Sequence, residues 1–212
     1  MSDSDETLFL ARLRVGDEGA FRQLLERHHS ALLRLARTFI KDSASAEEVV
    51  QETWLAVLEG LDGFEGRSAL KSWIFGILAN KARTRAVRDG RMVLFSDMTS
   101  GDEGDEAAVD PSRFKASGYW NEPPRPWDDF TPERLLSNAE MLQHIKYALE
   151  GLPEAQRAVV VIRDMEGCSA EEACNILGVS ETNQRVLLHR GRSRLRRMLE
   201  DTLSAAGKKD TP

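Results

Sequence analysis

The segment Ser169–Arg192, with the sequence SAEEACNILGVSETNQRVLLHRGR, determines how the rest of the chain is interpreted. Ser169 and Glu172 predict a capping box that opens a short helix, and Gly178 is predicted to end that helix. Ser180 predicts the cap of a longer second helix. A short helix, a tight turn and a longer helix form a helix-turn-helix. In this motif the first turns of the second helix enter the major groove of DNA.

The second helix of this motif carries the side chains expected to meet DNA. Thr182, Asn183 and Arg185 lie in its first turns; Arg185 suits guanine, and Asn183 can read adenine or hold a phosphate. No acidic residue lies between positions 183 and 199, and we expect the later arginines to neutralise phosphates: Arg190, Arg192, Arg194, Arg196 and Arg197. A solvated basic helix in an ordinary bundle is the alternative, since the helix dipole also favours arginine near a helix C-terminus.

The sequence before residue 91 is also predicted to be entirely helical. One amphipathic helix starts after Asp17, and a capping box of Ser45 and Glu48 predicts the start of a second. After a glycine-rich break, a third helix is expected over 69–88. Residues 67–88 contain no acidic side chain and carry six cations: Arg67, Lys71, Lys81, Arg83, Arg85 and Arg88. Aromatic residues beside cations suit single-stranded DNA, although core packing is the commoner role for Trp73 at helical spacing.

A stretch without helical periodicity separates the two helical parts. It holds an acidic cluster over 97–110, followed by three prolines at positions 123, 124 and 126. Helix resumes at Thr131-Pro132-Glu133, and a further helix opens at Pro153 and stops near Gly167. We therefore predict an all-α chain: an N-terminal domain over 5–91, an acidic and proline-rich linker over 92–130, and a helix-turn-helix domain over 131–204. With so long a linker, relative mobility of the two domains is the default expectation.

Composition excludes several other classes of protein. The 212 residues carry a net charge of −6, yet two acid-free basic stretches stand apart from the acidic cluster, so local charge favours contact with a polyanion. No apolar run reaches the length of a membrane span and no signal peptide is evident, which predicts a cytoplasmic protein without membrane insertion. Cys168 and Cys174 lack metal-site spacing and are expected to be small buried residues. No catalytic, metal or cofactor constellation appears, which disfavours an enzyme.

Several motifs, taken in their order along the chain, resemble the extracytoplasmic-function (ECF) class of bacterial RNA polymerase sigma factors. The resemblance rests on Gly16–Phe21, Ala46–Trp54, Phe64 to Asn80, Leu152–Arg157, Glu166–Ser180 and His189–Arg196. Family members are two-domain helical proteins that bind core RNA polymerase and read promoter DNA. The resemblance also implies an anti-sigma factor as a partner, and a linker that passes through the polymerase toward the RNA exit path.

Three sets of site residues follow from this resemblance. The set expected to bind core polymerase is Glu47, Glu48, Gln51, Glu52, Trp54 and Leu55. The set expected to melt and hold the −10 strand is Phe64, Arg67, Ser68, Lys71, Trp73, Asn80, Lys81, Arg83, Arg85 and Arg88. The set expected to read the −35 duplex is Thr182, Asn183, Arg185, His189, Arg190 and Arg192.

Two departures from the family pattern concern the −35 contacts. Gln184 replaces a small apolar residue on the apolar stripe of its helix, where a buried amide needs a hydrogen-bond partner. Leu187 stands where the family often has arginine. The alternative interpretation is a regulator that binds duplex DNA through the helix-turn-helix alone, with an N-terminal dimerisation or effector domain.

Overall fold

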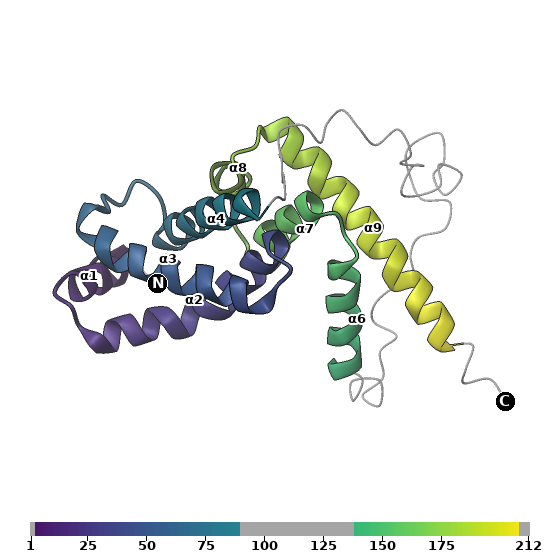
Figure 1. The fold of residues 1–212 in the computed structure, drawn as a ribbon, viewed down its shortest axis with the longest axis horizontal. Helices are drawn as coiled ribbons and strands as arrows, with labels where there is room; N and C mark the ends of the chain where they lie inside the picture. The colour runs from purple at the N-terminus through teal and green to yellow at the C-terminus, as the bar shows by residue number, and fades with distance from the viewer. Residues whose placement is uncertain (1–2, 90–137, 208–212) are drawn as a thin grey trace.

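The computed structural model describes residues 3–89 and 138–207, and within these ranges every regular element is a helix (Figure 1). The first part contains α1 (Asp3–Arg14), α2 (Glu18–Phe39), α3 (Ser43–Gly60), the 3-10 turn η1 (Leu61–Gly63) and α4 (Leu70–Arg88). The second part contains α6 (Asn138–Glu150), α7 (Glu154–Val160), the π-helical turn η4 (Val161–Met165), α8 (Ala170–Leu177) and α9 (Glu181–Gly207). The all-α prediction is confirmed. The linker over 92–130 and the helix start at Thr131 lie outside the described residues.

The first part is a helical bundle, and Asp17 fixes the start of its helix α2. The helix starts after Asp17 as predicted, and the Asp17 carboxylate caps it by accepting a hydrogen bond of 3.0 Å from the main-chain nitrogen of Ala20. Hydrogen bonding from Arg12 keeps the pKa of Asp17 below its ordinary value. The bundle core then forms from the apolar faces of α2, α3 and α4, including the buried side chains Leu24, Leu32, Leu35, Phe39, Val49, Val50, Ile74 and Leu78.

The start of α3 differs from the prediction. The cap is Asp42, whose carboxylate accepts from the main-chain nitrogen of Ser45 at 2.7 Å, so the helix begins at Ser43. The predicted capping box of Ser45 and Glu48 is wrong, because an aspartate three residues earlier already satisfies the amide of Ser45. Glu48 instead reaches across to α4, where it pairs with Arg85 at 2.8 Å.

The helix-turn-helix forms as the sequence predicts. Ser169 and Glu172 make both hydrogen bonds of the capping box at the start of α8. Gly178 ends that helix with φ 64° and ψ 39°, a left-handed conformation that costs glycine little. The hydroxyl of Ser180 accepts from the main-chain nitrogen of Asn183 at 3.2 Å and caps α9.

The helix predicted between Pro153 and Gly167 changes character halfway. It is α-helical through Val160 and then widens into the π-helical turn η4. The main-chain nitrogen of Cys168 closes the turn by donating to the carbonyl oxygen of Ile162 at 3.1 Å. The turn presents Glu166 toward the first part of the chain, where it meets Arg34 and Lys71.

The two described parts pack directly against each other. In Figure 1, α8 lies on α4, and α7 lies beside α2; both pairs of helices are in contact. Phe75 and Ala79 of α4 belong to the same continuous apolar cluster as Ile176 and Leu177 of α8, and all four are buried. The expectation of mobile domains therefore does not describe this structure, because a shared apolar core joins them.

Candidate nucleic-acid and polymerase interface

Five of the six residues predicted to bind polymerase form one exposed face of α3. Glu47, Glu48, Gln51, Glu52 and Leu55 are all exposed, and Leu55 retains 60% of its accessible surface. Trp54 lies on the opposite side of the helix and is buried. Its indole nitrogen donates to His29 at 3.3 Å, and its ring meets Phe21 edge-on with centroids 6.0 Å apart. Trp54 thus supports the face from behind.

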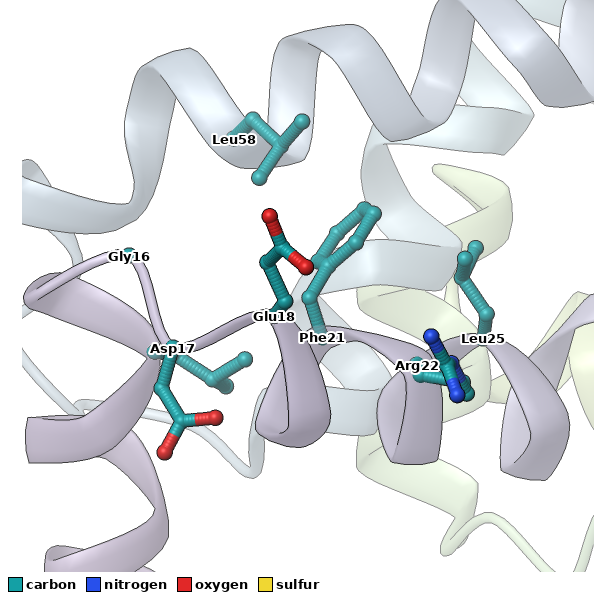
Figure 2. A pocket seen from close by; sticks show the side chains of 8 residues that line it. Gly16, Asp17, Glu18, Phe21, Arg22, Leu25 and Leu58 are labelled. Carbon is teal, nitrogen blue, oxygen red and sulfur yellow. The ribbon is translucent and has the colours of Figure 1, made fainter.

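A shallow hollow adjoins this face where α2 meets α3 (Figure 2). Figure 2 shows Glu18 and Phe21 of α2 pointing toward Leu58 of α3. The remaining lining residues are Leu13, Gly16, Asp17, Arg22 and Leu25. The hollow is mainly apolar, and with exposed Leu58 at its edge it extends the apolar surface around Leu55.

The loop before α4 is held in place by an aromatic pair and an arginine. The rings of Phe64 and Trp73 lie 4.9 Å apart between centroids, with Phe64 buried and Trp73 half-buried. Arg14 at the end of α1 donates to the carbonyl oxygen of Phe64 at 2.5 Å and to that of Leu61 at 3.5 Å. The next four residues, 65–68, stay exposed. The loop therefore has fixed ends and an accessible middle.

The cations of the loop and α4 do not form a single surface. Lys81 and Arg85 turn toward α3, where they pair with Glu52 at 3.8 Å and Glu48 at 2.8 Å. The hydrogen bond from Arg85 to Glu48 raises the pKa of that guanidinium. Arg67 pairs with Glu65 in the loop, and Arg88 is exposed at the end of the helix. One acid-free stretch of sequence thus supplies cations to several sides of one helix.

Lys71 and Arg83 face the helix-turn-helix part instead. Lys71 contacts the carbonyl oxygen of Glu166 and lies 3.3 Å from its carboxylate. Arg83 donates to the carbonyl oxygens of Leu177 and Ile176 at 3.1 and 3.0 Å, and also to Asn80 Oδ1 at 3.0 Å. Burial lowers the pKa of Arg83. Lys71 and Arg83, both predicted to hold the −10 strand, therefore bond to the helix-turn-helix part, and Asn80 of the same set bonds to Arg83.

The start of α9 presents only part of the predicted −35 set to the surface. Thr182, Arg185, His189 and Arg192 are exposed, and Arg190 is half-buried. Arg185 pairs with Glu181 one turn earlier at 2.5 Å. Arg192 forms two hydrogen bonds to Asp164, at 2.9 and 2.5 Å, which raise the pKa of the guanidinium. These side chains form the basic surface of the second helix.

Asn183 lies on the other side of α9, with 5% of its surface exposed. It follows the same helical stripe as Leu187 and Gly191, which are also buried. Gln184 is buried too, and its Nε2 atom has no hydrogen-bond partner among the described residues. The burial of Gln184 follows from its place on the apolar stripe and was predicted. The burial of Asn183, one position earlier, was not predicted.

Several residues at the contact between the two parts carried no sequence signal. Arg34 pairs with Glu166 at 2.6 Å across 132 positions of sequence, and Arg157 donates to the carbonyl oxygen of Thr38 at 3.2 Å. Ser72 bonds to Glu172, and this bond holds the pKa of the carboxyl group below its ordinary value. Such pairs join segments far apart in the chain, so no local spacing marks them.

The structure shows no further reactive centre in its described part. Burial raises the pKa of the Cys168 thiol to about 11, which keeps it protonated and unreactive at neutral pH. Residues 3–89 and 138–207 contain no group of histidine, cysteine and acidic side chains that could hold a metal ion. No helix in these ranges combines the length and hydropathy needed to cross a bilayer.

Two family models match the sequence of this chain. Residues 24–92 match Sigma-70 region 2, and residues 142–195 match Sigma-70, region 4; together they cover more than half of the chain. The ECF RNA polymerase sigma-E factor of Escherichia coli (strain K12) is 28% identical over 172 residues, covering 81% of this chain and 82% of that protein. The RNA polymerase sigma-H factor of Pseudomonas aeruginosa is 26% identical over 210 residues, covering 97% of this chain and 100% of its own length.

Two solved structures share the fold. CnrH, in complex with the cytosolic domain of CnrY, aligns with a TM-score of 0.55 and 23% identity over 92% of this chain and 97% of its own. The sigma factor RpoE of Bartonella quintana, in complex with the anti-sigma factor NepR, aligns with a TM-score of 0.55 and 24% identity over 85% and 96%.

The chain belongs to the ECF class of bacterial RNA polymerase sigma factors. It is a transcription initiation factor that binds core RNA polymerase and promoter DNA, and not an enzyme. The match of residues 24–92 to region 2 removes the alternative of a dimerisation or effector domain, because that segment is the one sigma factors share.

Proposed function

We propose that this sigma factor binds core polymerase through the exposed face of α3, holds the melted −10 strand with residues 64–68 and α4, and reads the −35 duplex with the first turns of α9. The observation that carries the proposal is the order of these three surfaces. The exposed face of α3 and the loop before α4 lie within the match to region 2, and the helix-turn-helix lies within the match to region 4.

The polymerase face of α3 combines charge with exposed apolar surface. Glu47, Gln51 and Glu52 surround Leu55, and protein interfaces commonly place an apolar centre within a polar rim. Trp54 acts from the core by fixing α3 against α2, so we assign it a supporting role.

The −10 surface combines aromatic and cationic groups around an accessible loop. Stacking of bases on aromatic rings and a cationic groove for the backbone are the usual means of holding a single strand. Trp73 beside Phe64 supplies the ring and Arg67 supplies charge in the loop, while Lys81, Arg85 and Arg88 supply charge further along α4. Ser68 and Asn80 offer hydrogen bonds to an extruded base.

The −35 surface consists of Thr182, Arg185, His189, Arg190 and Arg192. Arg185 lies in the first turns of α9 and is exposed, the position from which a recognition helix contacts base edges. The arginines further along α9 fit phosphates, whose contacts position the protein without reading sequence.

The proposal extends to regulation and location. Both solved structures with this fold are complexes with another protein, and one partner is described as an anti-sigma factor. We propose that an anti-sigma protein likewise holds this chain inactive, and that the chain acts in the cytoplasm, where RNA polymerase and DNA are found. Recovering such a protein with the tagged chain from native cells under several stresses tests this step. Repeated failure to recover one would count against it.

Core-polymerase binding is tested by a matched pair of variants. Leu55→Ser should weaken binding of the chain to purified core polymerase about tenfold or more, because Leu55 is the apolar centre of the α3 face. Leu8→Ser alters an equally exposed leucine of α1, at 64% against 60%, and should leave binding unchanged. Equal affinity of the two variants would contradict the assignment of this face.

A further inference from the structure

Two carboxylates lie within the surface proposed to read the −35 duplex, although that stretch of sequence was noted for its lack of acids. Glu181 is the first residue of α9, and Asp164 is supplied by the turn η4, 28 positions away from the arginine that it contacts. Each carboxylate bonds to one arginine of the −35 set, Glu181 to Arg185 and Asp164 to Arg192. Neither acid was predicted to be a site residue.

Arg192 and Asp164 form a pair with two parallel hydrogen bonds. Nε of Arg192 donates to Oδ2 of Asp164 at 2.9 Å, and Nη2 donates to Oδ1 at 2.5 Å. These bonds occupy one edge of the guanidinium, while Nη1 has no partner among the residues that the structure describes. Such a bidentate geometry fixes the plane of the guanidinium as well as its position. Arg192 therefore presents its outer edge in a defined direction, with 57% of the side chain exposed.

Arg185 and Glu181 form a second pair that is more exposed. Nη2 of Arg185 lies 2.5 Å from Oε1 of Glu181, one turn earlier on the same helix. The helix dipole favours a carboxylate at the first position of α9, and this carboxylate holds Arg185 toward the end of the helix that enters the major groove. An exposed pair of this kind contributes little to stability, so Arg185 can exchange it for a better partner.

Each pair cancels the charge that its arginine would otherwise offer to DNA. Binding to DNA of any sequence comes mainly from cations that neutralise phosphates and release counterions. An arginine beside its own carboxylate adds little to this attraction, and the carboxylate repels a phosphate that approaches out of register. A guanine edge carries no net charge and accepts two hydrogen bonds from arginine, so the carboxylate does not repel it in the same way. The two acids thus disfavour random DNA more than the −35 element.

The fixed geometry of Arg192 compensates for the cancelled charge only on a duplex in the correct register. Ordering a long side chain is one of the costs of binding, and Asp164 has already ordered this one. A phosphate that lies opposite Nη1 of Arg192 therefore meets a donor that is already in place. A phosphate elsewhere gains nothing from this donor and still meets the carboxylate of Asp164.

We propose that Asp164 and Glu181 are positioning residues that set the sequence specificity of the −35 surface. They hold Arg192 and Arg185 in place and weaken the contact of both arginines with random DNA. The inference rests on the proposed role of α9 in reading the −35 duplex. It assigns no contact with DNA to either acid, because each acts through the arginine to which it bonds.

Variants that remove the charge and keep the shape of each acid test this role. Asp164→Asn and Glu181→Gln are made singly and combined, and Asp164→Glu is the conservative variant that keeps the charge. Glu150→Gln removes the same charge from an exposed side chain at the end of α6 and is the control. Each chain is assembled with core polymerase. Its affinity is measured for two promoter fragments that share one −10 element, one with the −35 element of a promoter that the wild-type chain transcribes and one with that element scrambled.

The ratio of the two affinities is the readout, because polymerase and α4 contribute equally to both. The combined variant should bind the scrambled fragment about tenfold more tightly and the native fragment less than twofold more tightly. Its affinity for the scrambled fragment should also fall more steeply with salt, by about one unit of slope for each arginine released. Asp164→Glu and Glu150→Gln should stay near the wild-type ratio.

Two results would overturn the inference. An unchanged ratio in the combined variant would show that the acids do not set specificity. Equal loss of affinity for both fragments would show that the two pairs only support the fold of the helix-turn-helix. Equal binding of the two fragments by the wild-type chain would instead contradict the proposed role of α9, and the inference with it.

Discussion

Arg14 at the end of α1 donates a 2.5 Å hydrogen bond from Nη2 to the carbonyl oxygen of Phe64. The two residues lie 50 positions apart, and the bond fixes the start of the exposed loop over 65–68. Phe64 in turn packs on Trp73 of α4. The N-terminal helix therefore positions the segment that we propose holds the −10 strand.

Removing this bond should impair strand capture more than folding. Arg14→Gln is expected to slow promoter opening several-fold while polymerase binding stays unchanged, and Arg14→Lys should recover part of the loss by retaining one donor. Arg12→Gln, two residues earlier on the same helix, is the control. If Arg14→Gln and Arg12→Gln open promoters at the same rate, Arg14 has no positioning role.

Alanine variants of two glycines with similar backbone geometry distinguish the cost of backbone strain from the effect of a side-chain contact. Gly167 and Gly178 have φ values of 67° and 64°, so alanine at either should cost about 1–2 kcal/mol in the free energy of unfolding. A Cβ atom at Gly178 would also lie 2.9 Å from Nη1 of Arg83, whereas one at Gly167 meets nothing within 4 Å. Gly178→Ala should therefore also shift the Arg83 guanidinium from the end of α8, and the two variants should differ in stability by the value of that contact. Equal loss of unfolding free energy in Gly167→Ala and Gly178→Ala would show that the Arg83 contact contributes nothing to stability.

Asn183 and Arg185 should respond differently to alanine. Arg185→Ala is expected to weaken promoter binding by about 1–3 kcal/mol and to relax the −35 preference, since the side chain is exposed in the first turns of α9. Asn183→Ala should instead lower the free energy of unfolding by roughly 1 kcal/mol, because truncation of a buried side chain leaves a cavity. Thermal unfolding and binding to variant −35 duplexes separate the two effects. A specificity change caused by Asn183→Ala without loss of stability would refute this division.

His28 predicts a pH dependence of stability. Burial lowers its pKa below 6.5, and the neighbouring charges are Arg27 on α2, Lys71 on α4 and Glu166 directly after η4. The unfolded chain therefore takes up a proton at a higher pH than the folded chain does. The stability contributed by neutral His28 is present above pH 6.5 and is lost as the pH falls below that value.

Urea unfolding between pH 7.5 and 5.5 measures this effect. The free energy of unfolding should decrease toward pH 5.5 in the wild type, and His28→Phe should reduce the slope. His189→Gln replaces an exposed histidine of α9 and should leave the slope unchanged. Equal slopes for His28→Phe and the wild type would show that another group titrates in this range.

Local signals predicted most of the fold. The capping box at Ser169, the helix end at Gly178 and the helix start after Asp17 depend on residues within one turn of each other, so local spacing identifies them. The predicted box at Ser45 failed because Asp42 supplied a competing acceptor one turn earlier. The π-helical turn after Val160 carried no signal in the sequence.

The candidate site was only partly predictable for a related reason. Exposure of Glu47, Gln51 and Leu55 follows from helical periodicity. The division of the α4 cations between α3 and α8 depends on which helices pack against α4, and a charge count does not reveal it. Arg34 and Glu166 lie 132 positions apart, so their pairing becomes visible only in the folded chain.

The most direct test of the central claim, that this chain opens promoters with core polymerase through α4, is permanganate reactivity of −10 thymines. The wild-type chain with core polymerase should make these thymines reactive. The combined variant Lys81→Ala, Arg85→Ala, Arg88→Ala should abolish this while retaining −35 duplex binding. The charge-matched variant Arg12→Ala, Arg27→Ala, Lys146→Ala, at cations outside the three proposed surfaces, should keep it. No reactivity with the wild-type chain, or full reactivity with the α4 variant, would contradict the account.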